Sequence, residues 1–250
     1  MFEVLSNSII FAHRGASAHA PENTLAAFQL ALSQGADAVE LDARLSADGQ
    51  VVVIHDPTVD RTTNGHGRVA QLTLRELRSL DAGSFFSEKY RGEKIPLLEE
   101  IFEAVGKKML INVELKNSAA PPDQLVEKVC ALVEKQGLEK KIILSSFLAS
   151  NLKKAKRLLP KAPRGLLTVR GWKGAWARSF GFSFGDYAAL HPYLTDVTKQ
   201  QIVRVHRLKR RVHVWTVNKA EDMVRLNNWG VDGILTDDPQ LALRVMGRSL

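Results

Sequence analysis

The sequence predicts a TIM-type (β/α)8 barrel, an α/β fold, and three observations support this prediction. The chain has 250 residues, which suits one barrel-sized domain with a sizeable core. Short apolar segments alternate with amphipathic helical patterns along almost the whole sequence, as they do in a parallel sheet covered by helices. Several apolar segments end in a charged residue, and barrels of this kind build their active sites at the carboxyl ends of their strands. We therefore expect a single catalytic barrel domain over residues 1–250.

Nine short segments rich in β-branched and aliphatic residues have the length and composition of strands. They are 9–13, 38–43, 50–55, 109–115, 142–146, 165–169, 187–191, 212–217 and 233–236. Amphipathic patterns between them predict helices at 23–34, 97–105, 122–136, 149–158, 198–208, 220–229 and 239–246. Because such a barrel holds eight strands, one of the nine must lie elsewhere.

The surplus strand is 50–55, which follows its predecessor too closely to be parallel to it. Only the letters SADGQ separate ELDARL from VVVIHD, and a parallel crossover needs a dozen residues or more. The Asp-Gly pair in this linker is a hairpin signal, so 50–55 should run antiparallel to 38–45. With the turn centred on that pair, Asp42 should lie opposite His55. This pairing would bring His55 beside the carboxylates of Glu40 and Asp42.

Residues 57–96 interrupt the alternation of strands and helices and form an insertion of roughly forty residues. Turn signals occur at Asn64-Gly65 and Gly67, and one short helix is expected near 73–80. Long insertions at the catalytic end of a barrel usually shape access to the substrate site, and we expect this one to do so.

Composition indicates an ordinary globular protein, with 45% hydrophobic and 25% charged residues. The only cysteine, Cys130, excludes an intramolecular disulfide, and its neighbours place it on the apolar face of a helix. The segment MFEVLSNSIIF lacks the features of a signal peptide, and no apolar stretch approaches the roughly 18 residues of a membrane span. We expect a cytoplasmic protein.

The net charge of +8 is concentrated in one part of the chain. Residues 140–185 contain no acidic side chain and many lysines and arginines. A basic face of this kind attracts phosphates, nucleic acid or anionic lipid headgroups, and it is equally compatible with a plain solvated surface.

Three acidic residues at strand ends are candidate metal ligands. Glu40 and Asp42 lie two positions apart on one strand and therefore point to the same face, and Glu114 ends a later strand. Three unpaired carboxylates in one small site would force at least one to hold a proton, which a divalent cation would prevent. Because the set has oxygen ligands only, it favours Mg²⁺ or Ca²⁺. The alternative is a group of buried salt bridges between strands.

Basic and titratable side chains end the same strands. Arg14 and Lys116 would make the pocket positive towards a phosphate, Arg14 by a two-pronged contact and Lys116 as a point charge. His13 and His55 each follow four apolar residues and are the natural acid–base pair near neutral pH. Asn23 begins a predicted helix and is either involved in its capping or reaches the metal site. The remaining histidines that we considered, His19, His66, His206 and His213, are expected at the surface or in the insertion.

The order of short motifs along the chain resembles that of the glycerophosphodiester phosphodiesterase family. The motifs are HRG, PENT, ELD, VxxHD, ELK, SSF, WTVN and GVDGILTDDP. The resemblance covers nearly the whole chain and implies a barrel related to phosphatidylinositol-specific phospholipases. It also implies metal-dependent hydrolysis of small glycerophosphodiesters to sn-glycerol 3-phosphate and an alcohol. In the family pattern the carboxylates Glu40, Asp42 and Glu114 hold the metal, His13 and His55 are the acid and base, and Arg14 and Lys116 contact the phosphate.

Aromatic residues suggest where the rest of the substrate lies. We expect Trp215 and Phe147, which end two later strands, to wall the glycerol side of the pocket, although Trp215 is nearly as compatible with ordinary barrel packing. Asp237 is expected to anchor the last loop. In residues 171–187 tryptophan and phenylalanine alternate with lysine and arginine, which suits an anionic lipid surface or a lipid-like leaving group. Burial of these aromatics against the barrel is the other interpretation.

Two rival functions follow from these features. A lysophospholipase D would use the same site on lysophospholipids and would show an exposed apolar groove. A protein that only binds anionic surfaces through its basic block would not depend on Glu40 or His13. Nucleic acid is not an expected partner.

Overall fold

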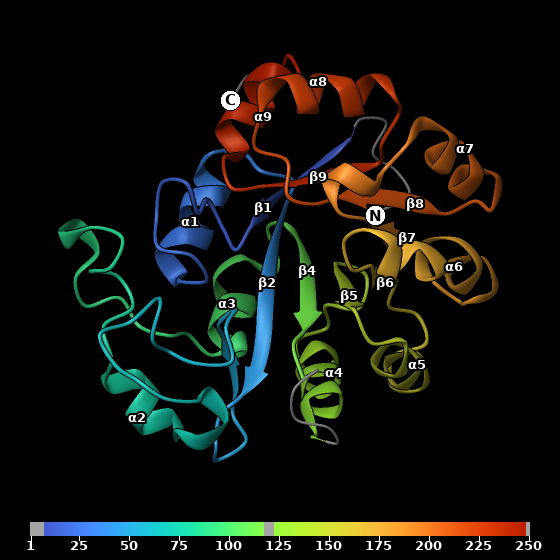
Figure 1. The fold of residues 1–250 in the computed structure, drawn as a ribbon. Helices are drawn as coiled ribbons and strands as arrows, with labels where there is room; N and C mark the ends of the chain where they lie inside the picture. Colours follow the sequence, from blue (N-terminus) through green and yellow to red (C-terminus); the bar gives the residue numbers. More distant parts are fainter. Residues whose placement is uncertain (1–7, 118–122, 249–250) are drawn as a thin grey trace.

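Nine strands form one sheet within residues 8–117 and 123–248, the part of the chain that the computed structural model describes (Figure 1). Eight strands run parallel and close into a barrel, since β1 pairs with both β2 and β9. They are β1 (Ile9–His13), β2 (Ala38–Leu45), β4 (Leu110–Leu115), β5 (Ile142–Ser146), β6 (Arg164–Leu167), β7 (Ala189–His191), β8 (Arg211–Val214) and β9 (Gly233–Thr236). The predicted fold class is confirmed.

Helices connect the strands and cover the outside of the barrel (Figure 1). They are α1 (Leu25–Ser33), α3 (Leu98–Val105), α4 (Leu125–Lys135), α5 (Ala149–Leu158), α7 (Lys199–Arg207), α8 (Ala220–Asn228) and α9 (Pro239–Val245), with the short α6 (Phe182–Phe184) before β7. Residue 122, the expected start of α4, lies outside the described residues, as do residues 1–7 of the segment that lacks signal-peptide features. Cys130 is buried on α4, as predicted. None of the helices in the described ranges has the length and apolar content needed to cross a membrane.

Alternate residues along each strand point into the barrel interior or outwards to the layer beneath the helices. Ile9 and Phe11 of β1 belong to an interior apolar cluster with residues of five other strands. Ile10 and Ala12, between them in sequence, pack outwards in clusters with helix residues. Two-residue periodicity then directs His13, the last residue of β1, towards the mouth of the barrel. The apolar interior thus forms a floor beneath the polar strand ends.

The hairpin exists as predicted, but its register differs by one residue. Strand β3 (Val51–Val53) runs antiparallel to β2, with Ala43 opposite Val53. Asp42 therefore lies opposite Ile54, whose N–H donates to the Asp42 carbonyl, and the predicted pairing with His55 is wrong. The connection has three residues rather than two, because Gly49 adopts φ +73° and adds a position to the turn. His55 still reaches the site, since the Arg44 guanidinium donates to its carbonyl oxygen at 2.7 and 3.0 Å.

The segment between β3 and α3 has a small apolar core of its own. It contains α2 (Leu74–Ser79), close to the expected helix, which lies at the side of the barrel beyond β2 and α3 (Figure 1). Thr73 and Glu76 form a capping box at its start. Side chains from β3 and from this segment pack together in that core: Val52, Ile54, Val59, Val69, Leu77, Ala82 and Ile95. The segment is thereby attached to the same hairpin that carries His55.

Replacing Gly15 with alanine is expected to lower the free energy of unfolding by about 2 kcal/mol or more. Gly15 has φ +83°, a conformation that a side chain disfavours, and an added Cβ would lie 2.6 Å from the Cβ of Ala27 on α1. Both the strain and the overlap act against the variant. Chemical denaturation of the purified variant measures the loss.

Gly137→Ala is the matched control for this prediction. Gly137 has a similar φ of +64°, but within the described residues no atom lies within 4 Å of its added Cβ. Only the backbone penalty applies there, so the loss should be about 1 kcal/mol. Equal losses at both positions would show that contact with α1 does not constrain Gly15.

His213 corrects one expectation, because it is buried inside the barrel and not at the surface. Only 1% of it is exposed, and its ring centroid lies 4.9 Å from that of Phe11. His191 of β7 is fully buried next to it, with Nε2 3.1 Å from His213 Nδ1. A side chain at Gly165 would overlap the His191 ring, so this glycine leaves room for the histidine pair.

Candidate active site

Three carboxylates from two adjacent strands meet at the mouth of the barrel. Glu40 and Asp42 lie on β2, and Asp42 pairs in register with Glu114 of β4. One oxygen from each carboxylate lies within 4.8 Å of the other two, and all three residues are buried. Asp42 Oδ1 has no hydrogen-bond partner in the described part of the chain. An unpartnered buried oxygen facing two further carboxylates fits a hard divalent cation.

Two cationic side chains lie directly beside these carboxylates. Lys116 Nζ is 3.0 Å from Glu114 Oε1 and 3.4 Å from Asp42 Oδ1. The backbone N–H of Arg14 donates to Glu40 Oε2 at 3.1 Å, and its Nε is 3.5 Å from Asp42 Oδ2. Arg14 has φ +57°, so the chain turns sharply here and presents both its N–H and its side chain to the site. The arrangement places positive charge where a phosphate could approach the carboxylates.

The three carboxyl groups differ in their affinity for protons. Burial, with the charges of Asp42 and Glu114, raises the pKa of Glu40 well above its usual range. Burial also raises the pKa of Glu114, to about 7, although Lys116 opposes the change. Burial acts in the same direction on Asp42, but Lys116 and Arg14 outweigh it and lower the pKa of that carboxyl. Near neutral pH Asp42 is therefore ionised, while protons compete with a cation for the carboxylates of Glu40 and Glu114.

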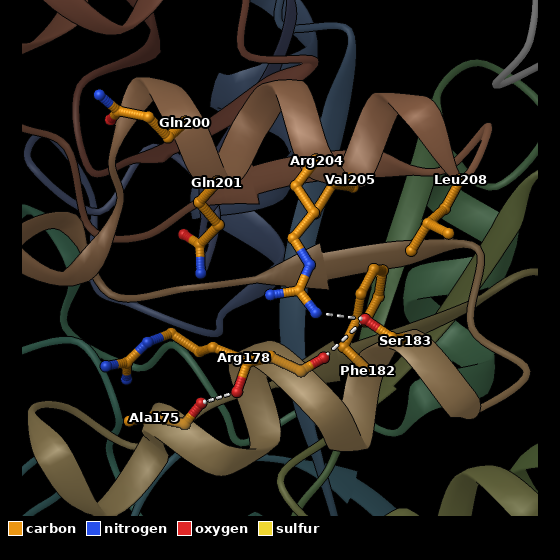
Figure 2. A pocket seen from close by; sticks show the side chains of 10 residues that line it. Ala175, Arg178, Phe182, Ser183, Gln200, Gln201, Arg204, Val205 and Leu208 are labelled. Carbon is orange, nitrogen blue, oxygen red and sulfur yellow. Dashed lines mark hydrogen bonds between the residues drawn. The ribbon is translucent and has the colours of Figure 1, made fainter.

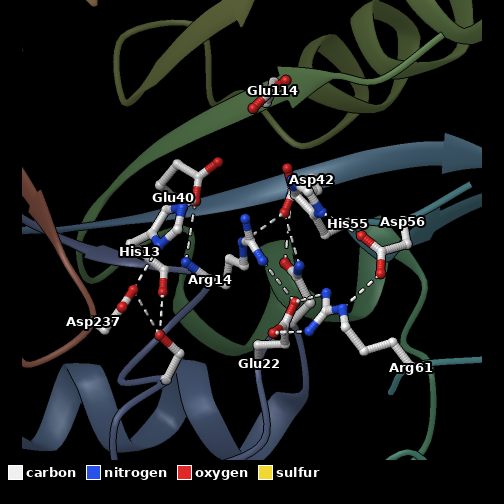
Figure 3. A network of polar contacts seen from close by, with 12 residues as sticks. His13, Arg14, Glu22, Glu40, Asp42, His55, Asp56, Arg61, Glu114 and Asp237 are labelled. Atoms are coloured by element: carbon white, nitrogen blue, oxygen red, sulfur yellow. Dashed lines mark hydrogen bonds and ion pairs between the residues drawn. The ribbon is translucent and has the colours of Figure 1, made fainter. Parts of the chain in front are cut away.

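His13 is held by a carboxylate from the opposite end of the chain. Its Nδ1 lies 2.6 Å from Asp237 Oδ1, and its Nε2 lies 4.0 Å from Glu40 Oε2 (Figure 3). Asp237 is itself held by Asn218, whose Nδ2 donates to Oδ2 at 2.6 Å, and by the Ser17 hydroxyl at 3.2 Å. When Nδ1 carries the proton and donates it to Asp237, Nε2 faces the carboxylates as a proton acceptor.

His55 has a corresponding carboxylate partner, Asp56, and this pair belongs to a longer polar network (Figure 3). His55 Nδ1 lies 2.7 Å from Asp56 Oδ1, and Arg61 donates to Asp56 Oδ2 at 2.6 Å. Arg61 also donates to both oxygens of Glu22, which in turn accepts from Arg14 Nη1 at 2.9 Å. Burial lowers the pKa of the His55 imidazole, which favours its neutral form near neutral pH. Through Arg61, residues 57–96 thus contact the partners of both His55 and Arg14.

Asn23 forms hydrogen bonds to Asp42 of the acidic cluster. Its Nδ2 donates to Asp42 Oδ2 at 2.9 Å, and its Oδ1 accepts from the Asp42 N–H at 3.4 Å. Thr24, not Asn23, caps α1, since its hydroxyl accepts from the Ala27 N–H. Of the two roles considered from the sequence, the structure places Asn23 against a candidate metal ligand.

A cavity of about 100 Å³ joins these side chains at the barrel mouth. Its lining comprises His13, Arg14, Glu40, His55, Asn112, Glu114, Lys116, Phe147, Leu167, Trp215 and Leu235. Phe147 and Trp215 meet edge to face on one wall, with ring centroids 5.8 Å apart. Trp215 Nε1 donates to the His191 carbonyl at 2.9 Å, which fixes the indole in place. The two aromatics predicted to contact glycerol therefore border the same cavity as the polar residues.

Several residues of this site were missed by sequence reasoning. Asp56 was given no role and Asp237 was expected only to anchor the last loop, yet each orients a histidine. Glu22 and Arg61 were given no role. Asn112 lines the cavity, and its Oδ1 has no hydrogen-bond partner among residues 8–117 and 123–248. Strand periodicity could have revealed Asn112, because it precedes Glu114 by two positions on the same inward face.

Comparison with known proteins identifies several relatives that are named for the same activity. The model of the glycerophosphoryl diester phosphodiesterase family matches residues 13–241. A glycerophosphodiester phosphodiesterase of Caldanaerobacter subterraneus subsp. tengcongensis is 40% identical over 96% of this chain and 98% of the relative. A crystal structure from Agrobacterium tumefaciens named for the same activity is 31% identical, with a TM-score of 0.82 over 95% of this chain and 99% of that one.

A further solved structure contains a ligand. It is an Oleispira antarctica phosphodiesterase in complex with the product sn-glycerol 3-phosphate, 32% identical to this chain. The match has a TM-score of 0.86 and covers 96% of this chain and 97% of that one.

Proposed function

The chain belongs to the glycerophosphoryl diester phosphodiesterase family, and on that premise we propose that it hydrolyses glycerophosphodiesters to sn-glycerol 3-phosphate and an alcohol by histidine acid–base catalysis. The observation that carries the proposal is the convergence of three buried carboxylates, two cations and two histidines at one barrel mouth. A relative with sn-glycerol 3-phosphate as its product supports the same product here. We further propose one catalytic domain over residues 1–250, with 57–96 as an insertion within it; the cytoplasmic location stays a prediction from the sequence.

Glu40, Asp42 and Glu114 would hold one divalent cation, Mg²⁺ or Ca²⁺. When bound, such an ion supplies a Lewis acid that polarises a phosphate oxygen and lowers the pKa of a hydroxyl or water. Arg14 and Lys116 would orient the phosphate and offset its remaining charge. Phe147 and Trp215 would enclose the glycerol carbons and exclude water from that side of the cavity.

The two histidines would act as a base and an acid, and they would exchange these roles if the reaction passes through a cyclic phosphate. The Nδ1–H of each histidine donates a hydrogen bond to a carboxylate, that of His13 to Asp237 and that of His55 to Asp56. This leaves each Nε2 available for proton transfer. One Nε2 takes the proton of the attacking oxygen, and the other protonates the departing alcohol. The attacking oxygen is either the glycerol 2-hydroxyl, with water opening a cyclic phosphate afterwards, or a water molecule directly.

Affinity for the cation is expected to fall as the pH drops below about 7. The pKa of Glu114 is raised to about 7 and that of Glu40 is raised in the same direction, so acidification protonates ligands that the cation needs in their ionised form. Each proton displaced weakens apparent binding by up to about tenfold per pH unit. Calorimetric titration of Mg²⁺ and Ca²⁺ at several pH values measures this slope. Glu103→Gln, which alters an exposed glutamate, should keep it, and a pH-independent affinity would contradict the prediction.

The proposed activity is tested on a panel of diesters by release of sn-glycerol 3-phosphate from the small diesters, or of acylated glycerol 3-phosphate from a lysophospholipid. Glycerophosphocholine, glycerophosphoethanolamine, glycerophosphoinositol and a lysophospholipid are each incubated with Mg²⁺, Ca²⁺ or a chelator. Cation-dependent release from the small diesters supports the proposal, and the panel identifies the leaving group. Cleavage of the lysophospholipid alone would favour a lysophospholipase D. Binding of a cation without turnover of any substrate would refute the proposed reaction.

Exposed aromatic residues support a second partner besides the small-molecule substrate, namely an anionic lipid surface. Trp172, Trp176, Phe180 and Phe184 are between 58% and 86% exposed, so the interpretation that the whole segment 171–187 is buried does not hold. Arg170 stacks on Tyr193, whose ring contacts that of Trp215, so the segment starts beside the cavity wall. Lys173 lies among the exposed aromatics and supplies positive charge towards anionic headgroups.

The exposed aromatics belong to a well-anchored segment. Phe182 is buried, and the Arg210 guanidinium donates to its carbonyl. A groove of about 300 Å³ separates the segment from α7, and Arg204 crosses it to bond the Ser183 hydroxyl at 3.1 Å (Figure 2). Arg178 is bound to Asp196 and to two backbone carbonyls. The outward direction of the tryptophans is therefore compatible with a surface built for insertion into lipid.

Sedimentation with vesicles tests the lipid surface. Binding to vesicles that contain phosphatidylglycerol should drop at least about tenfold in Trp172→Ser/Phe184→Ser, while cleavage of small diesters stays unchanged. Phe85→Ser/Phe86→Ser is the matched control, because these phenylalanines are exposed in residues 57–96. Binding that falls with salt but is equal in both variants would indicate a purely electrostatic surface and contradict insertion.

A further inference from the structure

A second cavity lies at the end of the barrel opposite the active site, where β5, β6, β7 and β8 begin. Its volume is about 290 Å³, and residues at the starts of these strands line it. The interior cluster that contains Phe11, Ile143 and Ala189 separates it from the polar strand ends. Its lining is therefore independent of the residues that form the proposed catalytic site.

Four cations surround this cavity, against one acidic residue. Lys140, Lys161, Lys209 and Arg211 line it together with Glu139. None of the four cations forms an ion pair with another described residue. Other basic residues of the same stretch are paired: Lys154 with Glu127, and Lys156 and Arg164 with Asp186. Cations that outnumber the acidic lining residue four to one create a positive potential that favours an anion in the cavity.

The floor of the cavity contains a buried polar atom without a partner. His213 lines the cavity and is 1% exposed, and its Nε2 makes no hydrogen bond to any residue that the structure describes. Its Nδ1 lies 3.1 Å from His191 Nε2. If His191 donates this bond, the His213 proton resides on Nε2 and needs an acceptor. An anion in the cavity would supply that acceptor.

Lys209, which lines the cavity, has an unusual backbone conformation. It directly follows Leu208, the C-cap residue of α7, and has φ +56°, the left-handed conformation that glycine usually provides at this position. A lysine here carries a conformational cost that glycine would avoid, and in return it brings a cation to the edge of the cavity.

We propose that this cavity binds a small phosphorylated anion, with Lys140, Lys161, Lys209 and Arg211 around it and the Nε2–H of His213 at its floor. A phosphate group carries up to two negative charges in a small volume and accepts several hydrogen bonds, which matches the charge excess and the unpartnered Nε2 of His213. The basic stretch of residues 140–185, whose lysines and arginines do not line the catalytic cavity, supplies two of the cations.

Calorimetric titration with inorganic phosphate tests the proposal, with sn-glycerol 3-phosphate as a second arm. Metal-stripped protein, dialysed free of chelator, is used so that no bound cation recruits phosphate to the catalytic site, and any phosphate held there by Arg14 and Lys116 should bind equally in every variant. Lys161→Gln/Lys209→Gln should weaken the remaining binding at least tenfold and leave kcat/KM for diesters unchanged. Tighter binding of one probe would identify its source as free phosphate or a phosphate ester.

The control variant is Lys199→Gln/Lys219→Gln, which removes the same charge at exposed positions next to the catalytic ends of β7 and β8. It should bind phosphate like the unaltered protein. The imidazole resonances of His213, but not those of exposed His66, should shift on titration. Equal phosphate binding by both double variants, or an unshifted His213, would overturn the proposal and show adventitious binding only.

Discussion

His13→Ala is expected to lower kcat/KM for glycerophosphodiesters by about 10²–10⁴-fold or more, the range of general acid–base catalysis. The Asp237 carboxylate holds His13 Nδ1 at 2.6 Å, so its Nε2 is directed towards the carboxylates. No other imidazole among the described residues lining the cavity is held by Asp237, so nothing replaces the lost group. Initial rates of sn-glycerol 3-phosphate release measure the effect.

His19→Ala is the control for this variant. His19 lies in the same loop after β1 and contacts Asp238 at 3.2 Å, but its side chain is 40% exposed and does not line the cavity. Its removal should change kcat/KM by less than about twofold. A comparable loss in both variants would indicate damage to the loop and not the absence of an acid or base.

A change of leaving group would assign the two histidines to their roles. A diester with a nitrophenol leaving group needs little protonation as it departs, so loss of the general acid should matter far less for it. If His13→Ala recovers most of its activity with that substrate and His55→Ala does not, His13 is the acid of the first step. The opposite pattern makes His55 the acid. Equal loss with both substrates and both variants would contradict separate acid and base roles.

Glu40→Gln is expected to have opposite effects on activity and on stability. Activity should fall on the order of 10²-fold or more, because the candidate cation loses one of three charged ligands. The metal-free protein should become more stable by about 1–2 kcal/mol near neutral pH, since burial and repulsion raise the pKa of Glu40 and make its charge costly. The amide oxygen can still accept from the Arg14 N–H, so the local contact is preserved.

Both parts of this prediction are measurable on one preparation. Thermal or urea denaturation after removal of metal gives the stability change, and saturation with Mg²⁺ or Ca²⁺ should stabilise the unaltered protein more than the variant. Glu103→Gln, on the exposed face of α3, should alter neither quantity. A less stable metal-free variant would argue that Glu40 serves as a structural salt-bridge partner, the alternative that the sequence left open.

Local patterns predicted much of the fold. Apolar segments of four or five residues, followed by amphipathic helices, were sufficient to predict β1, β5 and β9, whose bounds agree with prediction, and the helices between strands. The short linker after β2 was sufficient to predict the antiparallel hairpin. The number of residues in its turn was not predictable, because it depends on the left-handed conformation of Gly49, and one residue shifts the whole register.

Aromatic and histidine burial was harder to predict, since it depends on what packs against each side chain. The alternation in RVHV shows that His213 faces away from Val212 and Val214, but not which face is inside. Likewise, Phe182 is buried while Phe180 and Phe184, two positions away on either side, are exposed. Neighbouring elements, not the composition of the segment, decide these cases.

The sequence by itself determined the carboxylate, histidine, arginine and lysine positions of the candidate site. All but His55 lie in or directly after the parallel strands β1, β2 and β4, whose carboxyl ends meet in a closed barrel, and the hairpin after β2 carries His55. The partners that orient them depended on tertiary structure. His13 and Asp237 are separated by 224 residues, and Arg61 reaches Glu22 across 39. Periodicity describes contacts within one element, whereas these pairs exist only after barrel closure places the first loop beside the last and residues 57–96 pack against the first.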